Sequence, residues 1–246
     1  MTRDYDFVWL IWSSAFLVPW SLIYLARPAS RRHMLGVSAA TGLLGLTEPI
    51  FVPRYWNPPS LFGLAQRTGF DIESLIFCFA IGGIASAMYN ALAGRESLPV
   101  PEAERRSMRH RFHALALVIP YLGFPLLYAL PWNPIYPGIV ALAVGAASTV
   151  ACRPELGRKT LLGGVLFLAL YALFMGLLVV FAPGYIEQVW NLGDLSGALV
   201  AGVPLEELAF GFAFGMYWSG LYEHFSWRGT STPARSAFVS RGGHRA

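Results

Sequence analysis

The sequence predicts an all-α integral membrane protein, with seven transmembrane helices arranged as two parallel three-helix repeats joined by a linking helix. Three observations indicate this fold. Hydrophobic residues make up 55% of the chain and charged residues only 13%, whereas soluble domains carry about 25% charged residues. Several apolar runs approach the roughly 20 residues that a helix needs to cross a bilayer. One acidic sequence pattern also occurs twice, each time at the start of an apolar run.

Unbroken apolar runs define the transmembrane segments, because a membrane β-barrel would show strands of alternating polarity instead. The first run lacks a positively charged flank and is too long for the apolar part of a signal peptide, so we expect it to remain as a helix. The expected spans cover residues 7–26, 33–52, 70–93, 112–131, 135–151, 160–182 and 198–225.

Basic residues predict the orientation of these spans. Most arginines follow the first, third, fifth and seventh spans, and only Arg3, Arg54 and Arg67 fall at the opposite ends. The positive-inside rule therefore predicts an outer N-terminus and a cytoplasmic C-terminus for a multi-pass protein of the cytoplasmic membrane. Loops beside anionic lipid explain the net charge of +4, so no nucleic-acid partner is expected.

The two cysteines do not indicate a disulfide or a metal site. Cys78 and Cys152 fall at different depths in the predicted topology, and two thiols are too few for a structural zinc site. His33, His110 and His113 flank helix ends on the cytoplasmic side and are expected to be interfacial. The sequence therefore predicts no bound metal and no cofactor.

An ungapped alignment relates residues 69–82 to residues 202–215 and pairs Glu73 with Glu206. Such a match indicates an internal duplication. The first and fifth spans also end alike, in Arg-Pro. One helix between the two triplets makes them parallel, so the paired glutamates should face each other at similar depth. The expected units are a first repeat at 7–93, a cytoplasmic loop and linking helix at 94–134, a second repeat at 135–225 and a disordered cytoplasmic tail at 226–246.

Acidic residues near the ends of the apolar runs are the candidates for catalysis. Glu206 and Glu73 occupy equivalent positions, although their neighbours differ between the repeats. An acid above aromatic rings in an apolar cleft ionises less readily, so either could act as a general acid. Glu207 fits a simpler role at the helix dipole. Asp71 and Glu48 complete the set, and Glu48 could be a catalytic base or could cap a kink.

Aromatic residues near these acids are the candidates for substrate contact, namely Phe77, Phe210, Tyr217, Trp218 and Trp56. Helical spacing places Phe210 and Tyr217 on the same face as Glu206. Aromatic residues also mark the outer loops around Trp56 and Trp190, where they could form an interfacial belt or line a substrate pocket. The sequence leaves these two alternatives open.

The motif that runs from Pro204 through Glu206 and Glu207 to Phe210, within helix triplets that occur twice, resembles the lycopene cyclase domain family. These membrane-embedded carotenoid cyclases occur as heterodimers in bacteria and archaea and as fusions in fungi. The resemblance extends over most of residues 7–225 as two tandem copies, although the first motif lacks the proline and the second glutamate. The chain has no Gly-x-Gly-x-x-Gly fingerprint of the kind found in soluble, flavin-dependent cyclases.

The resemblance implies a lycopene cyclase-like isomerase that carries out an acid-initiated, non-redox cyclisation of a polyene end group. Glu206 or Glu73 would protonate the terminal double bond, while Asp71, Glu207 or Glu48 would tune that acid or take a proton back. Aromatic rings would stabilise the carbocation in a site without water. The implied partners are lycopene or a related carotenoid, membrane lipid and other enzymes of the carotenoid pathway.

A different class of function remains open, because a carotenoid- or isoprenoid-binding membrane protein without turnover would need the same apolar site. A retinal photoreceptor is disfavoured, because the only lysine, Lys159, is expected in a cytoplasmic loop. An intramembrane protease with paired glutamates is disfavoured as well. Its motif would place an arginine after Glu206 and Glu207, and no histidine lies at membrane depth.

Overall fold

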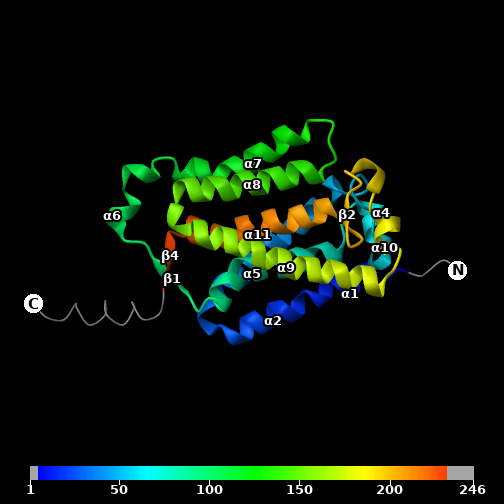
Figure 1. Cartoon of the computed structure of the whole chain (residues 1–246), viewed down its shortest axis with the longest axis horizontal. Helices are drawn as coiled ribbons and strands as arrows, with labels where there is room; N and C mark the ends of the chain where they lie inside the picture. Colours follow the sequence, from blue (N-terminus) through cyan, green and yellow to red (C-terminus); the bar gives the residue numbers. More distant parts are fainter. Residues whose placement is uncertain (1–4, 232–246) are drawn as a thin grey trace, which may run out of the picture.

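The computed structural model describes residues 5–231, which form a bundle of long helices lying side by side (Figure 1). The short helices α4 (Leu64–Thr68) and α10 (Tyr185–Val189) lie at one end of the bundle, and α6 (Glu102–Arg105) lies at the other. The helices of the bundle are α1 (Val8–Ala15), α2 (Leu17–Ala26), α3 (Arg31–Gly42), α5 (Ile72–Leu92), α7 (His113–Tyr128), α8 (Ile135–Cys152), α9 (Gly157–Phe181) and α11 (Leu205–Phe225).

Short 3-10 helices connect or extend these elements. The longest of them, η2, continues α3 towards the α4/α10 end and contains Pro49. Long 3-10 segments are uncommon and often mark a strained or functional stretch of chain. The 3-10 helices are η1 (Pro28–Ser30), η2 (Leu43–Ile50), η3 (Leu61–Gly63), η4 (Met108–His110), η5 (Pro154–Leu156) and η6 (Leu192–Asp194).

Four helical stretches of the described chain are long and apolar enough to cross a membrane. They correspond to the predicted spans 7–26, 70–93, 135–151 and 160–182. The first divides into α1 and α2 at Phe16, because Pro19 has no N–H to donate to the carbonyl of Ala15. The seven-span arrangement stays a prediction. The four stretches are Val8–Ala26, Ile72–Leu92, Ile135–Cys152 and Pro154–Phe181.

The remaining three predicted spans differ from long regular helices. The span 33–52 is α helical only to Gly42 and continues as η2, while α7 is apolar but shorter than the four stretches above. The last span, 198–225, becomes helical only at Leu205. The residues before it form a hairpin, because Ala201 and Gly202 both have positive φ angles, of 52° and 82°, as the tight turns of hairpins require.

Two small antiparallel sheets correct the expectation of a purely α-helical fold. Strand β2 (Leu199–Val200) pairs with β3 (Val203–Pro204) in this hairpin, and β1 (Glu96–Pro99) pairs with β4 (Arg228–Ser231) at the end opposite α4. Residues 228–231 are therefore not part of a disordered tail, because their backbone groups pair with β1. The rest of the predicted tail, residues 232–246, lies outside the described residues.

Backbone conformation is closely matched at the positions that the sequence repeat pairs. Arg27 has φ −129° and ψ 74°, and Arg153 has φ −130° and ψ 71°; each precedes a 3-10 turn that begins with proline. Gly69 and Gly202, which open the two aligned segments, have φ angles of 83° and 82°. The two halves thus share local geometry at these four positions, while the division into two repeats stays a prediction.

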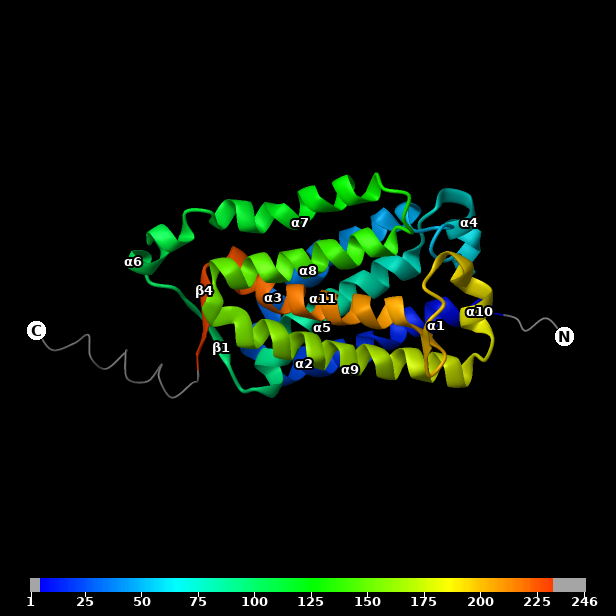
Figure 2. The same ribbon diagram turned by 45° about the horizontal axis from the view of Figure 1, so that its top comes forward.

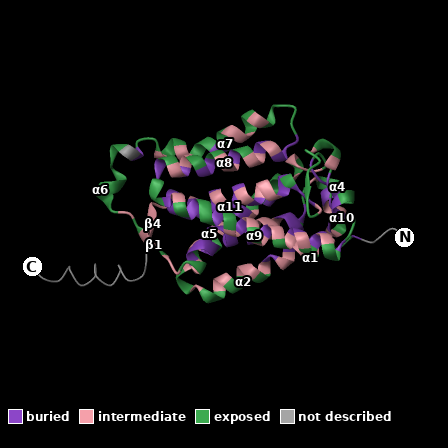
Figure 3. Ribbon diagram, viewed as in Figure 1, coloured by how far each residue is buried: buried purple, intermediate pink, exposed green. Residues whose placement is uncertain are grey.

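Helices α5 and α11 lie in the centre of the bundle and carry most of their residues buried, whereas α2 and α7 are largely exposed (Figure 3). Close packing depends on small residues. A Cβ atom at Gly215 of α11 would lie 2.5 Å from the Cβ of Phe167 in α9, so the two helices approach nearly backbone to backbone. The exposed side chains of α2 and α7 are mostly apolar, as expected for helices that face lipid.

Candidate active site

A cavity of about 400 Å³ lies between the two halves of the bundle and is lined mainly by aromatic and aliphatic side chains. Its walls come from both predicted repeats and from α7. The charged residues in its lining are Glu48 and Glu207. The aromatic residues in its lining are Trp9, Trp12, Phe16, Phe51, Tyr55, Trp56, Phe77, Tyr121, Phe124, Tyr171, Trp190, Phe210, Phe214, Tyr217 and Trp218.

Glu207 lies in the first turn of α11, is only 4% exposed and accepts three hydrogen bonds. The hydroxyl of Tyr55 and the indole N–H of Trp190, the latter at 2.8 Å, donate to Oε1, and the hydroxyl of Tyr171 donates to Oε2. Three donors to one carboxylate form a strong, charge-assisted set of hydrogen bonds. Burial, together with the charge of Glu207, raises the pKa of Tyr55 well above its usual value, so Tyr55 keeps the proton that it donates.

Glu48 lies in η2 and accepts a hydrogen bond from the indole N–H of Trp56 at 2.6 Å. The rings of Trp56 and Trp190 are in turn 5.2 Å apart, centroid to centroid. These four residues form a continuous series, Glu48–Trp56–Trp190–Glu207, which we call the Glu–Trp array. It joins the two carboxyl groups of the cavity through the two loops that contain Trp56 and Trp190.

Backbone hydrogen bonds hold the Glu–Trp array in place. The N–H of Asn57 donates to the carbonyl of Val189 at 2.8 Å, and the N–H of Asn191 donates to the carbonyl of Tyr55 at 2.9 Å. The two tryptophans thus lie in a short antiparallel bridge between loops that are far apart in the sequence. Backbone pairing of this kind limits the freedom of both indoles.

All five aromatic residues that the sequence predicts for substrate contact line the cavity: Phe77, Phe210, Tyr217, Trp218 and Trp56. They pack edge-on or stacked with further rings, as shown by centroid distances of 5.3 Å between Trp9 and Phe77 and 4.4 Å between Phe214 and Trp218. The indole of Trp218 also donates to Thr41 at 2.8 Å. Packing and hydrogen bonds therefore fix the orientation of these walls.

Three of the predicted acids do not line the cavity. Oε1 of Glu73 accepts the backbone N–H of Leu61 at 2.7 Å, and Oε1 of Glu206 accepts the backbone N–H of Ser196 at 2.8 Å. The repeat-paired glutamates thus each hold the loop that precedes their own helix. Asp71 caps α5 by accepting the N–H of Ser74 at 2.6 Å, a common role for aspartate at a helix start.

Two residues of the site are absent from the sequence-based candidates: Tyr55 and Tyr171. Trp190 belongs to the loop aromatic residues for which the sequence leaves an interfacial belt and a pocket lining open. Tyr171 has no such signal, since it is one of many apolar or aromatic residues in α9. Trp56 and Trp190 both line the cavity, and a role for them in substrate contact stays a prediction.

A second buried polar group lies at the opposite end of the bundle. Lys159 forms an ion pair with Glu223, and Oε1 of Glu223 also accepts from Asn90 at 3.0 Å and from Ser97 at 2.6 Å. The sequence predicts Lys159 in a cytoplasmic loop, but it is 1% exposed in the first turn of α9. The pairing explains the difference, since a buried lysine needs a partner.

Comparison with known proteins bears on the second half of the chain. Residues 133–225 match the lycopene cyclase family model. The matched region contains α8, α9 and α11 with the motif from Pro204 to Phe210, and it supports a carotenoid cyclase-like function and an apolar polyene substrate. Together with the four apolar helices it indicates a membrane protein. Two tandem copies of the domain stay a prediction, and no curated protein and no solved structure matches the chain.

Proposed function

We propose that the protein is an isomerase that cyclises the end group of lycopene or a related carotenoid by acid catalysis. A carboxylic acid adds a proton to the terminal double bond, and the resulting tertiary carbocation is attacked by the next double bond, which closes the ring with a new C–C bond. Loss of a ring proton to a carboxylate then restores a double bond. Atoms and electrons balance without an oxidant or reductant, so the reaction requires no redox cofactor.

The observation that carries this proposal is the presence of two carboxyl groups, Glu48 and Glu207, in one aromatic cavity. Protonation and deprotonation need one group that carries a proton and one that does not. One oxygen of Glu48 accepts the indole N–H of Trp56, and we assign Glu48 as the acid that carries the proton. Glu207 accepts three donors on its two oxygens, which suits a carboxylate that stabilises the cation and accepts the ring proton.

The aromatic lining supports the carbocation step. Rings attract a cation over their faces, and this attraction strengthens when water is excluded. Phe77 of α5 and Phe210 of α11 occupy paired positions in the predicted repeats and both line the cavity. A volume of about 400 Å³ is within the range of roughly 300–1,000 Å³ that small-molecule sites cover, so an end group and the adjoining chain would be held between these rings.

The polyene would reach this site from within the membrane. Leu44 of η2 and Tyr121 of α7 line the cavity and are also 39% and 55% exposed, so the cavity reaches the surface beside them. Helix α7 packs chiefly against α8 and lies along one side of the bundle (Figure 2). The remaining length of the polyene would leave between η2 and α7 into lipid.

Topology and duplication form part of the same proposal. Helices α5 and α11 both begin at the α4/α10 end and lead to β1 and β4, which pair with each other. This supports two parallel repeats, each of which supplies one tryptophan to the Glu–Trp array. Seven spans would place the N-terminus outside and the C-terminus in the cytoplasm. Reporter fusions at the C-terminus test this orientation. A periplasmic signal would contradict the proposed cytoplasmic C-terminus.

The test of function is expression of the full chain in a bacterium that accumulates lycopene, followed by chromatography and mass spectrometry of the pigments. A product of unchanged mass with cyclic end groups is the expected result, and the exposed Glu102→Gln serves as a control for expression. Purified protein that retains lycopene without converting it would instead establish the non-catalytic binding function.

A further inference from the structure

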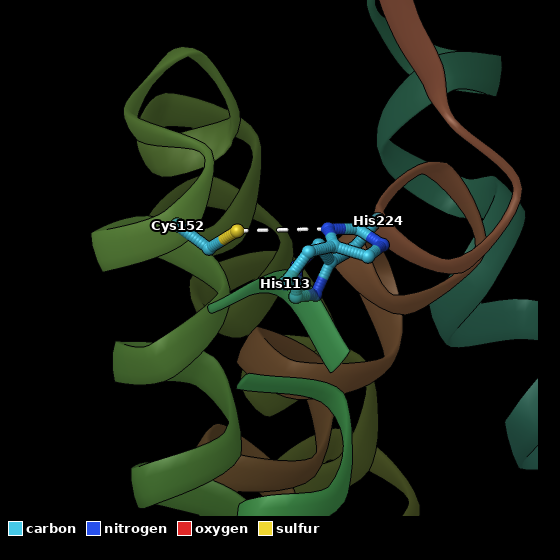
Figure 4. Close-up of side chains that lie close together, drawn as sticks. All are labelled: His113, Cys152 and His224. Carbon is cyan, nitrogen blue, oxygen red and sulfur yellow. Dashed lines mark hydrogen bonds between the residues drawn. The ribbon is translucent and has the colours of Figure 1, made fainter. Parts of the chain in front are cut away.

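The β1/β4 end of the bundle contains a cluster of histidine and cysteine side chains that is separate from the cavity. His113 begins α7, Cys152 ends α8 and His224 lies in the last turn of α11. One nitrogen of each ring and the sulfur lie within 4.8 Å of one another. Figure 4 shows the three side chains gathered between their helices. None of them lines the cavity, so the proposed cyclase chemistry does not explain the cluster.

A fourth side chain, that of His110, lies beside Cys152. Nδ1 of His110, which is buried, lies 3.8 Å from Sγ of Cys152, and Nδ1 of His113 lies 3.5 Å from the same sulfur. Zinc bonds of about 2.3 Å to sulfur and about 2.0–2.1 Å to nitrogen in tetrahedral geometry place the two ligand atoms about 3.5 Å apart. The distances from the sulfur of Cys152 to these two histidine nitrogens are therefore close to those between ligand atoms of a tetrahedral zinc site.

His224 carries a nitrogen atom that the protein itself leaves without a partner. Nε2 of His224 is buried and has no hydrogen-bond partner among the described residues. A buried nitrogen without a partner is costly. Nδ1 of His224 lies 3.2 Å from Oγ1 of Thr149, an arrangement typical of metal-ligating histidines, which use one nitrogen for the metal and the other for a supporting hydrogen bond.

The cluster lies against the ring of Trp227, and the two guanidinium groups over that ring, those of Arg105 and Arg153, pair with glutamates. The ring of Trp227 stacks on His113 at 3.9 Å and meets His110 edge-on at 5.2 Å. Arg153 follows Cys152 in the chain, but its guanidinium pairs with Glu155 and donates to the carbonyl of Arg228 at 3.1 Å. The guanidinium of Arg105, which lies 5.3 Å from the centroid of the Trp227 ring, pairs with Glu102.

We propose that His110, His113, Cys152 and His224 form a structural zinc site. Thiolate and imidazole ligands favour zinc over magnesium or calcium, and four protein ligands fill a tetrahedral site without leaving a position for substrate. Because α7 otherwise packs chiefly against α8, the ion fastens this helix to α11 as well. The sequence-based expectation of no metal rests on the small number of cysteines. Three of the four proposed ligands are instead histidines, which come from two distant segments.

Cobalt provides a direct test, because a Co²⁺ ion bound by a thiolate shows a sulfur-to-metal charge-transfer band. The full-length protein in detergent is treated with a chelator and then titrated with Co²⁺. One ion per chain with a charge-transfer band and the visible bands of tetrahedral cobalt is expected, and excess Zn²⁺ should displace it. Folded wild-type protein without the charge-transfer band would overturn the proposal.

Variants assign the ligands. Cys152→Ser should remove the charge-transfer band, whereas Cys78→Ser, which removes the other thiol, should keep it; an unchanged band in Cys152→Ser would overturn the assignment. His110→Ala should weaken Co²⁺ binding at least tenfold, and the same substitution at His33 should not. Added Zn²⁺ should raise the Tm of the wild-type protein and of Cys78→Ser but not that of Cys152→Ser, a readout independent of carotenoid turnover.

Discussion

Trp56 and Trp190 pack against each other with their ring centroids 5.2 Å apart, and each donates its indole N–H to a different glutamate of the cavity. The two indoles come from loops in opposite halves of the chain and are joined by a backbone bridge. Neither carboxyl group can therefore shift without disturbing the other. This relationship provides the pair of positioned acids that a protonation–deprotonation sequence needs.

Replacing Glu207 by glutamine should reduce cyclisation by roughly 100- to 10,000-fold, the range for loss of a general acid or base. The side chain keeps its size but loses the charge that three donors surround. Product per unit of protein, measured by chromatography of pigments from membranes, checks this. The matched control is Glu206→Gln in the adjacent position, which should retain more activity. Glu206 does not line the cavity, and it accepts hydrogen bonds from Ser196 and Tyr136. Equal losses in both variants would contradict these roles.

The same substitution at Glu48 should also reduce cyclisation by at least roughly 100-fold, because glutamine cannot deliver a proton to an alkene. Glu48 accepts the indole N–H of Trp56, which glutamine can still satisfy through its carbonyl oxygen, so the protein should keep its fold. Retention of bound lycopene by the purified variant, with no ring formed, is the expected pattern. Near wild-type turnover would remove Glu48 as the acid.

Trp190→Phe should remove one of the hydrogen bonds to Glu207 while keeping an aromatic ring against Trp56. A hydrogen bond to a charged group contributes about 1.5–3 kcal/mol, and a loss of this size should appear as a lower Tm in detergent and as reduced turnover. Trp56→Phe is the matched variant at Glu48. An unchanged Tm and unchanged activity in both variants would show that the Glu–Trp array has no role in positioning.

Lys159→Met should destabilise the protein by about 3–5 kcal/mol, because it leaves Glu223 buried without its cation. Thermal unfolding in detergent measures the loss. Arg106→Ala is the control, since Arg106 pairs with Glu102 at the exposed surface, where such a pair contributes at most about 1 kcal/mol. The Lys159→Met, Glu223→Leu double variant should recover part of the lost stability, and a double variant less stable than Lys159→Met would contradict the assignment.

The long apolar runs predict the main helices because composition alone determines whether a segment can lie in lipid. The hairpin before α11 and the 3-10 conformation of η2 could not be predicted from the sequence, because they depend on local turn geometry and on contacts with α5. Phe210 and Tyr217 are predictable from helical spacing to Glu206, whereas Tyr171 is not. Which acid lines the cavity cannot be predicted from the sequence. Adjacent residues such as Glu206 and Glu207 point in different directions, and only tertiary contacts decide which of them lines the cavity.

The histidines of the proposed zinc site also could not be predicted as a cluster from the sequence. His110 and His113 lie beside helix ends in the sequence and look interfacial, and His224 has no distinguishing neighbour. Their proximity to Cys152 arises only when α7, α8 and α11 come together. Spacing along the chain therefore contains no signal for the zinc site that we propose.

Cyclisation in heavy water tests acid-initiated chemistry most directly. Membranes containing the protein are incubated with lycopene in D₂O over many turnovers, so that exchangeable protons of the site equilibrate with solvent. Mass spectrometry should find one solvent deuterium per ring formed, because the proton added to the terminal double bond stays in the product. A cyclic product without deuterium would contradict protonation by a carboxyl group as the initiating step.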